Sequence, residues 1–420
     1  MYCGSCLRDN TLAAALMDAG HDVLLIPTYT PTRTDERNVS LGRVFLGGIN
    51  VYLQQNFELF RRIPWGLDRI LDFAPLLRLT TRWGISVDPA RLGRLTVSML
   101  RGRDGFQRKE IRKLVRFLAA AAPDIISIPN SLLIGLAPAI KAEMKVPICC
   151  TLQGEELFLD GLGEPYRSES LRLIREHTEH VDAFTAVSNF GARTMADYLK
   201  VDNSRIRVVP LGINFDGYAK SNGGDPGIFT IGYLARIAPE KGLHVLCDAY
   251  RRLKSRAGLP PSRLFAAGYL GRDHRNYLAE IRKNLETWGL SADFNYHGEL
   301  DRGGKLAYLQ KLSVFSVPGH YEDPKGLFLL EAMASGIPVV QPRCGAFAEI
   351  VEATGGGVLV EAGNPDALAQ GILDLWRDPE KRRGLGARGY EGVRRFYGSS
   401  RMSEMALDVY RSLLKIDGKN

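Results

Sequence analysis

The second half of the chain repeats one pattern, a short apolar run followed by a helix-like segment, and this alternation constrains the fold most strongly. The apolar runs lie at 228–234, 263–267, 294–297, 314–317, 337–340 and 358–361. Consecutive strands that are separated by helices form a parallel sheet, because the crossover helix returns the chain to the same edge. The sequence therefore predicts an α/β fold with a doubly wound, Rossmann-like sheet in this half.

The first half carries a similar alternation, which ends in a segment with the composition of a linker. Its apolar runs lie at 124–128, 146–152, 182–187 and 206–209, and residues 210–226 are rich in Gly, Pro, Ser and Asn, as linkers are. We predict an N-terminal Rossmann-like domain over 1–215, a C-terminal one over 216–400, and a helix over 401–420 that crosses back toward the N-terminal domain. Two such domains imply a ligand site in a cleft between them, at the carboxyl ends of the strands.

The beginning of the chain departs from this pattern. Residues 11–19 are typical of a helix, residues 21–27 and 44–54 are strand-like, and residues 2–10 are typical of a Gly-containing loop. A βαβ unit needs a strand before its first loop, and that strand is central in doubly wound sheets. The first strand of the N-terminal domain is missing from the pattern, so we expect a short apolar strand to be encoded upstream.

Positive charge is concentrated in one segment. The chain has a net charge of +8, and residues 61–116 hold fourteen Lys or Arg against five Asp or Glu. A basic, Trp-containing segment can contact anionic lipid or an anionic acceptor, and it can also be an ordinary solvated face of surface helices. The longest apolar region, 117–140, is interrupted by Pro123, Asp124, Pro129 and Asn130, so it is not expected to span a membrane.

The cysteines indicate a reducing compartment. Six scattered cysteines do not form a disulfide framework. Cys3 and Cys6 have the spacing of a redox or zinc pair, but the adjacent Cys149 and Cys150 are poorly placed to complete a zinc site, so ordinary thiols are the simpler interpretation. The sequence predicts a cytoplasmic protein, either free or associated with the cytoplasmic face of a membrane, and no nucleic-acid partner.

Two loops between a strand and a helix carry the candidate chemistry. Arg236 and Lys241 lie five positions apart in the loop after 228–234, where a guanidinium and an ammonium can converge on a diphosphate; two unrelated surface cations would look the same. Asp323 and Glu331 flank the start of the helix after 314–317. Glu331 has no basic residue three or four positions away, so we expect it to face a polar cleft or a ligand, or else to bond a neighbouring loop.

The helix start near Gly326 and Leu327 favours an anion, because backbone N–H groups point outward there and Gly permits close approach. Asp323 precedes Pro324, and an Asp-Pro pair is also a good helix N-cap with its first residue. The residue types therefore leave Asp323 with two interpretations, a contact to ligand hydroxyls and a helix cap.

These residues resemble the signature of family 4 retaining glycosyltransferases of the GT-B fold, in which two Glu residues are usually separated by seven positions. Asp323 and Glu331 stand at that spacing, followed by Ala-Met-Ala-Ser-Gly-Ile-Pro-Val-Val. Similar segments are Gly232–Arg236 with Pro239–Gly242, Ala186–Ser188, Arg207–Asn214 and Tyr296–Gly298. The resemblance covers the second half strongly, 120–215 moderately and 30–115 weakly.

The resemblance implies a role for each matching position. Arg236 and Lys241 would neutralise the donor diphosphate, Glu331 would hold the ribose hydroxyls, and Asp323 would touch the donor sugar. The loop with Gly345 and Ala346 would line the sugar pocket. The implied residues are, for catalysis, Asp323, Gln153, Arg236 and Lys241; for the donor, Arg236, Lys241, Gly326, Leu327, Glu331, Gly298 and Gly345; and on the acceptor side, Gly4, Ser5 and Glu155.

Two positions depart from the family pattern. Asp323 stands where the family usually has Glu, and Glu322 precedes it. Gln153 stands at the end of the 146–152 strand, where the family often has His; a Gln can hydrogen-bond a sugar hydroxyl but cannot act as an acid or base. Transfer with retention need not fail, because the leaving phosphate can take the proton.

The sequence as a whole predicts a retaining glycosyltransferase that uses a nucleotide-diphosphate sugar and a carbohydrate or lipid-linked saccharide acceptor. We expect no cofactor and no metal, since the chain contains no Asp-x-Asp and the leaving group can be stabilised by cations and helix-end amides. A catalytically impaired nucleotide-sugar-binding or assembly protein of the same fold is the alternative. Another GT-B activity, such as that of an epimerase or phosphorylase, is a third possibility that donor turnover would separate.

Overall fold

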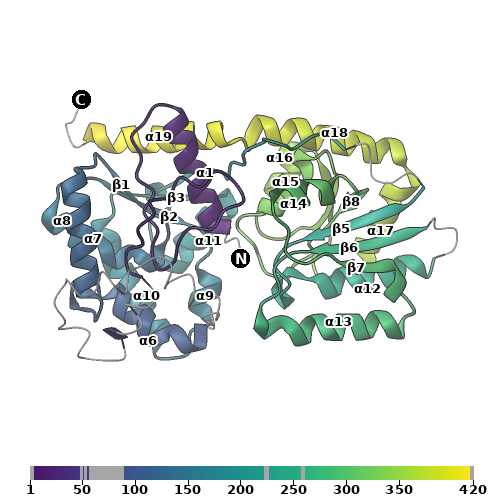
Figure 1. The fold of residues 1–420 in the computed structure, drawn as a ribbon, viewed down its shortest axis with the longest axis horizontal. Helices are drawn as coiled ribbons and strands as arrows, with labels where there is room; N and C mark the ends of the chain where they lie inside the picture. Colours follow the sequence, from purple (N-terminus) through teal and green to yellow (C-terminus); the bar gives the residue numbers. More distant parts are fainter. Residues whose placement is uncertain are drawn as a thin grey trace. The chain divides into compact units, whose positions relative to one another are not determined.

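The computed structural model describes residues 4–47, 51, 54–55, 89–221, 227–256 and 261–416. The chain divides into two compact units (Figure 1). The C-terminal unit is Leu211–Arg401, and the N-terminal unit joins Tyr2–Pro210 with Met402–Asn420. The sequence-based limits at 215/216 and 400/401 fall close to these boundaries.

The C-terminal unit is built on a parallel sheet. Its strands are β5 (Phe229–Leu234), β6 (Ser262–Ala267), β7 (Phe294–Tyr296), β8 (Val314–Phe315), β9 (Val339–Pro342) and β10 (Gly357–Val360). Its main helices are α12 (Leu243–Lys254), α13 (Arg275–Thr287), α14 (Arg302–Leu309), α15 (Leu327–Ala334), α16 (Phe347–Thr354), α17 (Pro365–Arg377) and α18 (Pro379–Phe396). The predicted strands of this half are confirmed, and each neighbouring pair is parallel.

The strand order of this sheet is β10-β9-β8-β5-β6-β7. The order reverses between β8 and β5, which is the point where a doubly wound sheet opens a crevice at the carboxyl ends of its strands. The loops that leave β5 and β8 therefore lie next to each other. These are the two loops in which the sequence places Arg236, Lys241 and Asp323.

Burial explains why α15 carries so few polar residues. The helix is apolar on every side, and its residues 328–334 are all buried. A helix without a polar face must be covered on all sides. Inside this apolar helix Glu331 is the exception, and its surroundings are described below.

The N-terminal unit has a smaller parallel sheet. Its strands are β1 (Ile126–Ile128), β2 (Ile148–Leu152), β3 (Ala183–Ala186) and β4 (Ile206–Val208), in that order across the sheet. Its helices are α1 (Gly4–Asp18), α6 (Pro89–Leu100), α7 (Arg108–Ala121), α8 (Ala137–Glu143), α9 (Glu156–Asp160), α10 (Tyr166–His177), α11 (Asn189–Leu199) and α19 (Ser399–Ile416). The four strands predicted here are confirmed, and β2 is buried along its whole length.

The C-terminal helix α19 packs on the N-terminal unit. Its side chains Met402, Ala406 and Val409 share a buried cluster with Leu12 and Leu16 of α1. Because these contacts are apolar and fully enclosed, they hold the end of the chain against its beginning.

The first fifty residues differ from the prediction. Helix α1 begins at Gly4, so the expected loop over 2–10 is wrong for its described part. In the described parts of the expected strands at 21–27 and 44–54, the backbone forms isolated parallel bridges, Leu25 with Ser40 and Thr28 with Phe45. Tyr29 and Leu46 have φ angles of 63° and 56°, which interrupt the extended backbone that a ladder requires. The expected upstream strand stays a prediction.

Part of the basic segment 61–116 lies outside the described residues, which resume at 89. In the remainder, exposed arginines such as Arg108 and Arg112 lie on α7.

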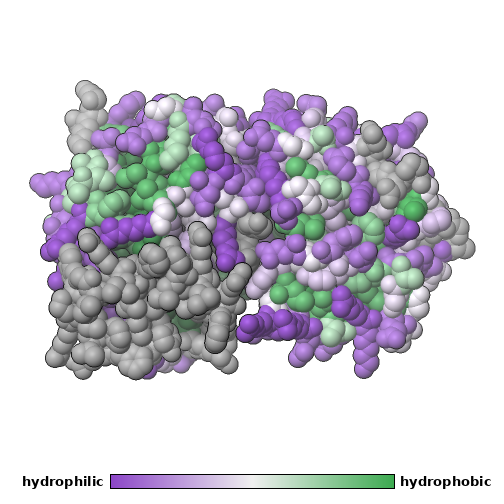
Figure 2. Space-filling view, in the orientation of Figure 1, coloured by the Kyte–Doolittle hydropathy of each residue, from purple (hydrophilic) through white to green (hydrophobic). Residues whose placement is uncertain are grey.

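Figure 2 shows hydrophilic residues over much of the visible described surface. Among the described residues, large hydrophobic side chains are exposed at Leu24, Phe106 and Leu157. Within the described ranges, no helix is both long and apolar enough to cross a membrane.

Candidate functional site

The loop after β5 carries Arg236 and Lys241 to the reversal point of the C-terminal sheet. A 3-10 turn, Pro239–Lys241, leads into α12, and Gly242 begins that helix with a φ of 73°. A Cβ at Gly242 would lie 2.1 Å from the carbonyl oxygen of Pro318. The loop can therefore approach the β8 loop this closely only because residue 242 is Gly.

Lys241 and Asp323 form an ion pair between these two loops. Lys241 Nζ lies 2.5 Å from Asp323 Oδ2, and the Asp323 side chain is only 8% exposed. Burial raises the pKa of Asp323, but Lys241 and Lys325 lower it by more, so its pKa lies below the ordinary value. Asp323 is thus held as a buried carboxylate with a cation against it.

The helix-cap interpretation of Asp323 is wrong. The N-cap of α15 is Gly326, with a φ of 64°, and no side chain caps this helix. Asp323 Oδ1 instead accepts a hydrogen bond from the N–H of Lys325, at 2.9 Å, inside the loop. The helix start at Gly326 and Leu327 consequently keeps its outward-facing amides free of a side-chain cap.

The loop after β9 fixes the backbone of Asp323. The Ala346 N–H donates to the Asp323 carbonyl oxygen at 2.9 Å. A Cβ at Gly345, whose φ is 53°, would lie 2.5 Å from the same oxygen. Gly345 is therefore brought against Asp323, as the predicted donor site requires, and a larger residue would displace the loop.

Arg236 lies on the open side of this group. Its Nη2 pairs with Glu240 Oε1 within the same loop, and its side chain is 40% exposed. The Tyr233 hydroxyl donates to the Arg236 carbonyl oxygen at 3.2 Å. The backbone of Arg236 is therefore anchored, while its exposed guanidinium pairs with Glu240, a partner that a stronger anion could replace.

Glu331 has a charged partner that local sequence spacing did not reveal. Lys305 Nζ of α14 lies 2.5 Å from Glu331 Oε1, and both side chains are about nine-tenths buried. The Tyr218 hydroxyl donates to the same oxygen at 3.2 Å. The expectation that Glu331 lacks a basic partner is wrong, because its partner comes from another helix.

A signal for Lys305 was present in the sequence. Lys305 shares a face of α14 with the buried Tyr308 and Leu309, at the spacing of an apolar helix face. A Lys in such a position must find a carboxylate or remain costly to bury.

Gly298 lies farther from this group. It follows β7, which is separated from β5 by β6. Its φ is 74°, and its carbonyl oxygen accepts from the Gly268 N–H at 2.8 Å. The preceding His297 has a lowered pKa, because burial and Lys311 disfavour its charged form. Gly298 thus shapes the end of β7 and makes none of the contacts around Lys241.

The residues predicted for the acceptor side lie in the N-terminal unit. Gly4 and Ser5 lie in the first turn of α1. The Gln153 N–H donates to both carboxylate oxygens of the buried Glu155, at 3.1 and 3.0 Å. The Gln153 side-chain Nε2 donates to the Pro129 carbonyl oxygen at 2.8 Å. Gln153 and Glu155 therefore lie together after the carboxyl end of β2, beside the residue that follows β1.

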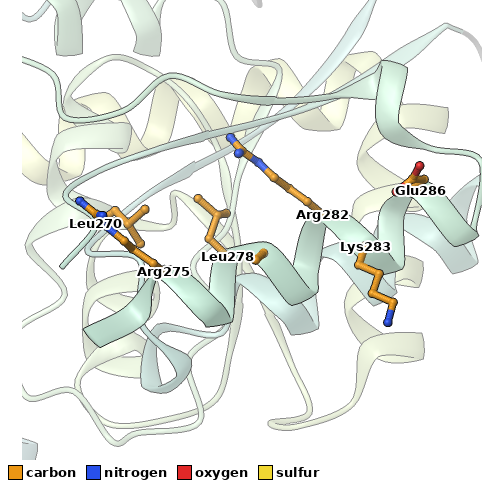
Figure 3. A pocket seen from close by; sticks show the side chains of 7 residues that line it. Leu270, Arg275, Leu278, Arg282, Lys283 and Glu286 are labelled. Atoms are coloured by element: carbon orange, nitrogen blue, oxygen red, sulfur yellow. The ribbon is translucent and has the colours of Figure 1, made fainter. Parts of the chain in front are cut away.

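A groove of about 460 Å³ lies along α13 of the C-terminal unit. Figure 3 shows Arg275, Leu278 and Arg282 of this helix among the side chains that line it. None of the predicted site residues lines it. Metal ligands are a separate question, and the described ranges contain no cluster of three or more His, Cys, Asp or Glu side chains placed to hold an ion.

Comparison with known proteins places two family models in succession on the chain. The model described as Glycosyltransferase Family 4 matches residues 79–216, and that described as Glycosyl transferases group 1 matches residues 217–392. The two matched regions adjoin close to the boundary between the N-terminal and C-terminal units.

Curated relatives are glycosyltransferases at modest identity. A phosphatidyl-myo-inositol mannosyltransferase of Mycobacterium leprae is 29% identical over 245 residues, which are 57% of this chain and 62% of that protein. A 2-deoxystreptamine N-acetyl-D-glucosaminyltransferase of Streptomyces fradiae is 25% identical over 290 residues, 65% of this chain and 66% of that protein. The chain thus matches less than two thirds of the length of these relatives.

Solved structures share the architecture. A sucrose-phosphate synthase from Thermosynechococcus elongatus has a TM-score of 0.70 at 18% identity, and the match covers 96% of this chain and 92% of the synthase chain. Anabaena HepE, solved in complex with UDP, has a TM-score of 0.64 at 19% identity, and the match covers 73% of this chain and 82% of the HepE chain. At such identities these structures show the fold alone, and that fold is GT-B.

Proposed function

We propose that this chain, which belongs to the group 1 glycosyltransferases of family 4, transfers a sugar with retention of configuration from a nucleotide-diphosphate sugar to a carbohydrate or lipid-linked saccharide. The observation that carries the proposal is the Lys241–Asp323 ion pair where the strand order of the C-terminal sheet reverses, with Arg236 in the same loop as Lys241. Ligands bind at such points in open α/β sheets. Paired cations beside a helix start suit a diphosphate.

The cations would stabilise the leaving group. In the transfer, the bond between the sugar C1 and the diphosphate oxygen breaks, the acceptor oxygen bonds to C1 on the same face, and the acceptor proton passes to the leaving phosphate. Arg236, Lys241 and the amides at Gly326 and Leu327 would meet the growing negative charge. We propose that no metal or other cofactor takes part.

The carboxylates would position the donor. Glu331 Oε1 is held by Lys305 and Tyr218, which fixes the carboxylate so that it can accept from ribose hydroxyls. Asp323, kept ionised by Lys241, would accept from a hydroxyl of the donor sugar once the diphosphate draws Lys241 away. Donor binding would therefore replace the ion pair between Lys241 and Asp323 by an ion pair between Lys241 and the diphosphate.

A thermal-shift screen with UDP, GDP, ADP and dTDP tests the donor assignment. A ligand that binds the native state raises its unfolding midpoint by mass action. We expect one nucleotide to raise it, and the corresponding nucleoside monophosphate to raise it less, because the second phosphate supplies the contact with Arg236 and Lys241. If none of the four stabilises the protein, the donor proposal fails.

An impaired nucleotide-sugar-binding protein remains the second candidate. It is favoured by Gln153, which cannot exchange protons at the position where the family often has His. A donor-hydrolysis assay with the nucleotide sugar that binds best separates the two functions, since turnover excludes the impaired protein.

We also propose an acceptor at or near the cytoplasmic face of a membrane. The support is the basic segment 61–116, together with relatives whose names include the lipid phosphatidyl-myo-inositol. Among the described residues, Cys149, Cys150, Cys247 and Cys344 form no disulfide, which suits a reducing compartment. Sedimentation with phosphatidylglycerol vesicles, compared with phosphatidylcholine vesicles at low and high salt, tests the membrane contact.

A further inference from the structure

The side-chain amide of Gln153 is buried, with a fixed orientation and one unused oxygen. Gln153 is 2% exposed and follows β2. Its Nε2 donates to the Pro129 carbonyl oxygen at 2.8 Å and faces Asp9 Oδ1 at 3.4 Å. Its Oε1 has no hydrogen-bond partner among the residues that the structure describes. Both N–H groups of the amide therefore donate within the protein, and the oxygen remains able to accept a hydrogen bond from a ligand.

The orientation of this amide follows from its two acceptors. If the amide were turned over, its oxygen would face the Pro129 carbonyl and the Asp9 carboxylate, and acceptor would meet acceptor. Asp9 is held in turn by Arg8, whose Nη1 lies 2.9 Å from Asp9 Oδ1 and whose side chain is 3% exposed. Asp9 and Arg8, which the sequence did not single out, thus determine which way Gln153 points.

Further open oxygens lie close by in the fold. Asn130 Oδ1 and the fully buried Ser131 Oγ also have no hydrogen-bond partner within the described ranges. Both follow β1, which pairs with β2 so that Ile128 lies beside Cys150. Three unpartnered polar atoms at the carboxyl ends of adjacent strands are unusual, because buried polar groups are nearly always hydrogen-bonded.

We propose that Gln153 Oε1 accepts a hydrogen bond from a neutral hydroxyl of a substrate, and that Asp9 is the positioning residue that holds the amide for this contact. The open atoms of Gln153 and Asn130 are acceptors, and the carboxylate of Glu155 lies against the Gln153 backbone. Such a corner suits the hydroxyl of a sugar or another polyol and disfavours an anionic group. The inference rests on the proposed function, because it names the chemistry that a glycosyltransferase substrate presents here.

The hydroxyl can come from the transferred sugar or from the acceptor, and two measurements separate these sources. The first is the ratio of dissociation constants for UDP-glucose and UDP, or for the equivalent pair with the preferred base. The second is the KM for the acceptor in the transfer reaction. Loss of one neutral hydrogen bond should change one of these values by about five- to tenfold.

The variants Asp9→Ala, Gln153→Ala and the double variant test whether Asp9 acts through Gln153. We expect both single variants to change the same measured value, and the double variant to change it no further, because Asp9 has nothing to position once the amide is gone. Asp9→Asn keeps an oxygen that can accept from Nε2 and should lose less than Asp9→Ala. Asp18→Ala, an exposed carboxylate on the same helix with Arg37 as its partner, is the matched control.

Three results would overturn the inference: additive effects of the two single variants, unchanged values in both measurements, or a loss confined to the thermal unfolding midpoint. Unchanged values would mean that the oxygen is satisfied by solvent or serves packing only. Failure of the proposed function is distinguishable, because the wild-type protein would then bind no nucleoside diphosphate. Failure of this inference leaves that binding intact.

Discussion

Lys241 Nζ lies 2.5 Å from Asp323 Oδ2, and this ion pair joins the loops that leave β5 and β8. The pair places a cation and a carboxylate side by side at the reversal point of the sheet. In the proposed function, Lys241 binds the diphosphate and Asp323 accepts a hydrogen bond from the sugar. Lys241 would therefore leave Asp323 and pair with the diphosphate when the donor binds.

Replacing Asp323 by Asn should reduce stability in a pH-dependent way. The pKa of Asp323 is lowered in the folded protein, so its charge stabilises the fold above the unfolded value of 3.8 and ceases to do so as the pH falls through the folded value. We expect Asp323→Asn to lower the free energy of unfolding by about 3 kcal/mol at pH 7. Near pH 3 the difference from wild type should shrink.

Urea unfolding at pH 7 and at pH 3 measures this difference, and donor turnover by the same variant at pH 7 reports on the sugar contact. Glu352→Gln is the control, because Glu352 is an exposed partner of Arg343 and should change stability by less than about 0.5 kcal/mol. An equal loss at both pH values would contradict the assigned charge state. Normal turnover by a folded Asp323→Asn protein would remove Asp323 from the reaction.

The sequence predicted the sheets well because each strand is a short apolar run between turn residues. It predicted the candidate loops because Arg236, Lys241 and Asp323 lie in the segments between such runs and the helices that follow them. It did not predict that Lys305 partners Glu331, since contacts between separate helices leave no fixed spacing in the chain. The apolar pattern at 21–27 was misleading for a related reason, because a ladder needs a neighbouring strand in register and local composition does not report one.

Replacing Arg236 by Ala should weaken nucleoside diphosphate binding. A charge-assisted contact to phosphate would be lost, at a cost of about 2 to 4 kcal/mol, or about 30-fold or more in Kd. The side chain is 40% exposed and its partner Glu240 is in the same loop, so stability should change little. Calorimetric titration with the stabilising nucleotide measures the change.

Arg251→Ala is the matched control for Arg236→Ala. Arg251 also pairs with a carboxylate of its own segment, Asp248, but it lies in the last turn of α12. Its loss should leave nucleotide affinity unchanged. Equal affinity of the Arg236→Ala and Arg251→Ala proteins would refute the role given to Arg236.

Glu331 and Lys305 allow stability to be separated from binding. Removing either partner alone leaves an unpaired buried charge, so Glu331→Leu and Lys305→Met should each lower the free energy of unfolding by about 3 to 5 kcal/mol. The double variant replaces the pair by apolar side chains and should recover much of that loss. Its affinity for the nucleoside diphosphate should stay low, because the carboxylate proposed to bind ribose is absent.

Urea unfolding and nucleotide titration of these three proteins measure the two effects. If the double variant regained both stability and nucleotide affinity, Glu331 would be a structural residue alone. If neither single variant lost stability, the ion pair itself would be in question.

Gly345→Ala should harm the site more than its backbone angle alone explains. Gly345 and Gly289 both have left-handed φ angles, 53° and 71°, so an Ala costs about 1 to 2 kcal/mol of conformational energy at either position. At Gly289 an added Cβ meets nothing within 4 Å, whereas at Gly345 it would lie 2.5 Å from the Asp323 carbonyl oxygen. The Gly345 variant must therefore move the loop that holds Asp323, at a further cost of about 1 to 3 kcal/mol.

We expect Gly289→Ala to lose stability and keep wild-type turnover, and Gly345→Ala to lose more stability and to lower donor turnover as well. Urea unfolding with initial-rate assays decides the matter, and equal turnover by the two variants would show that the position of Asp323 does not limit the reaction.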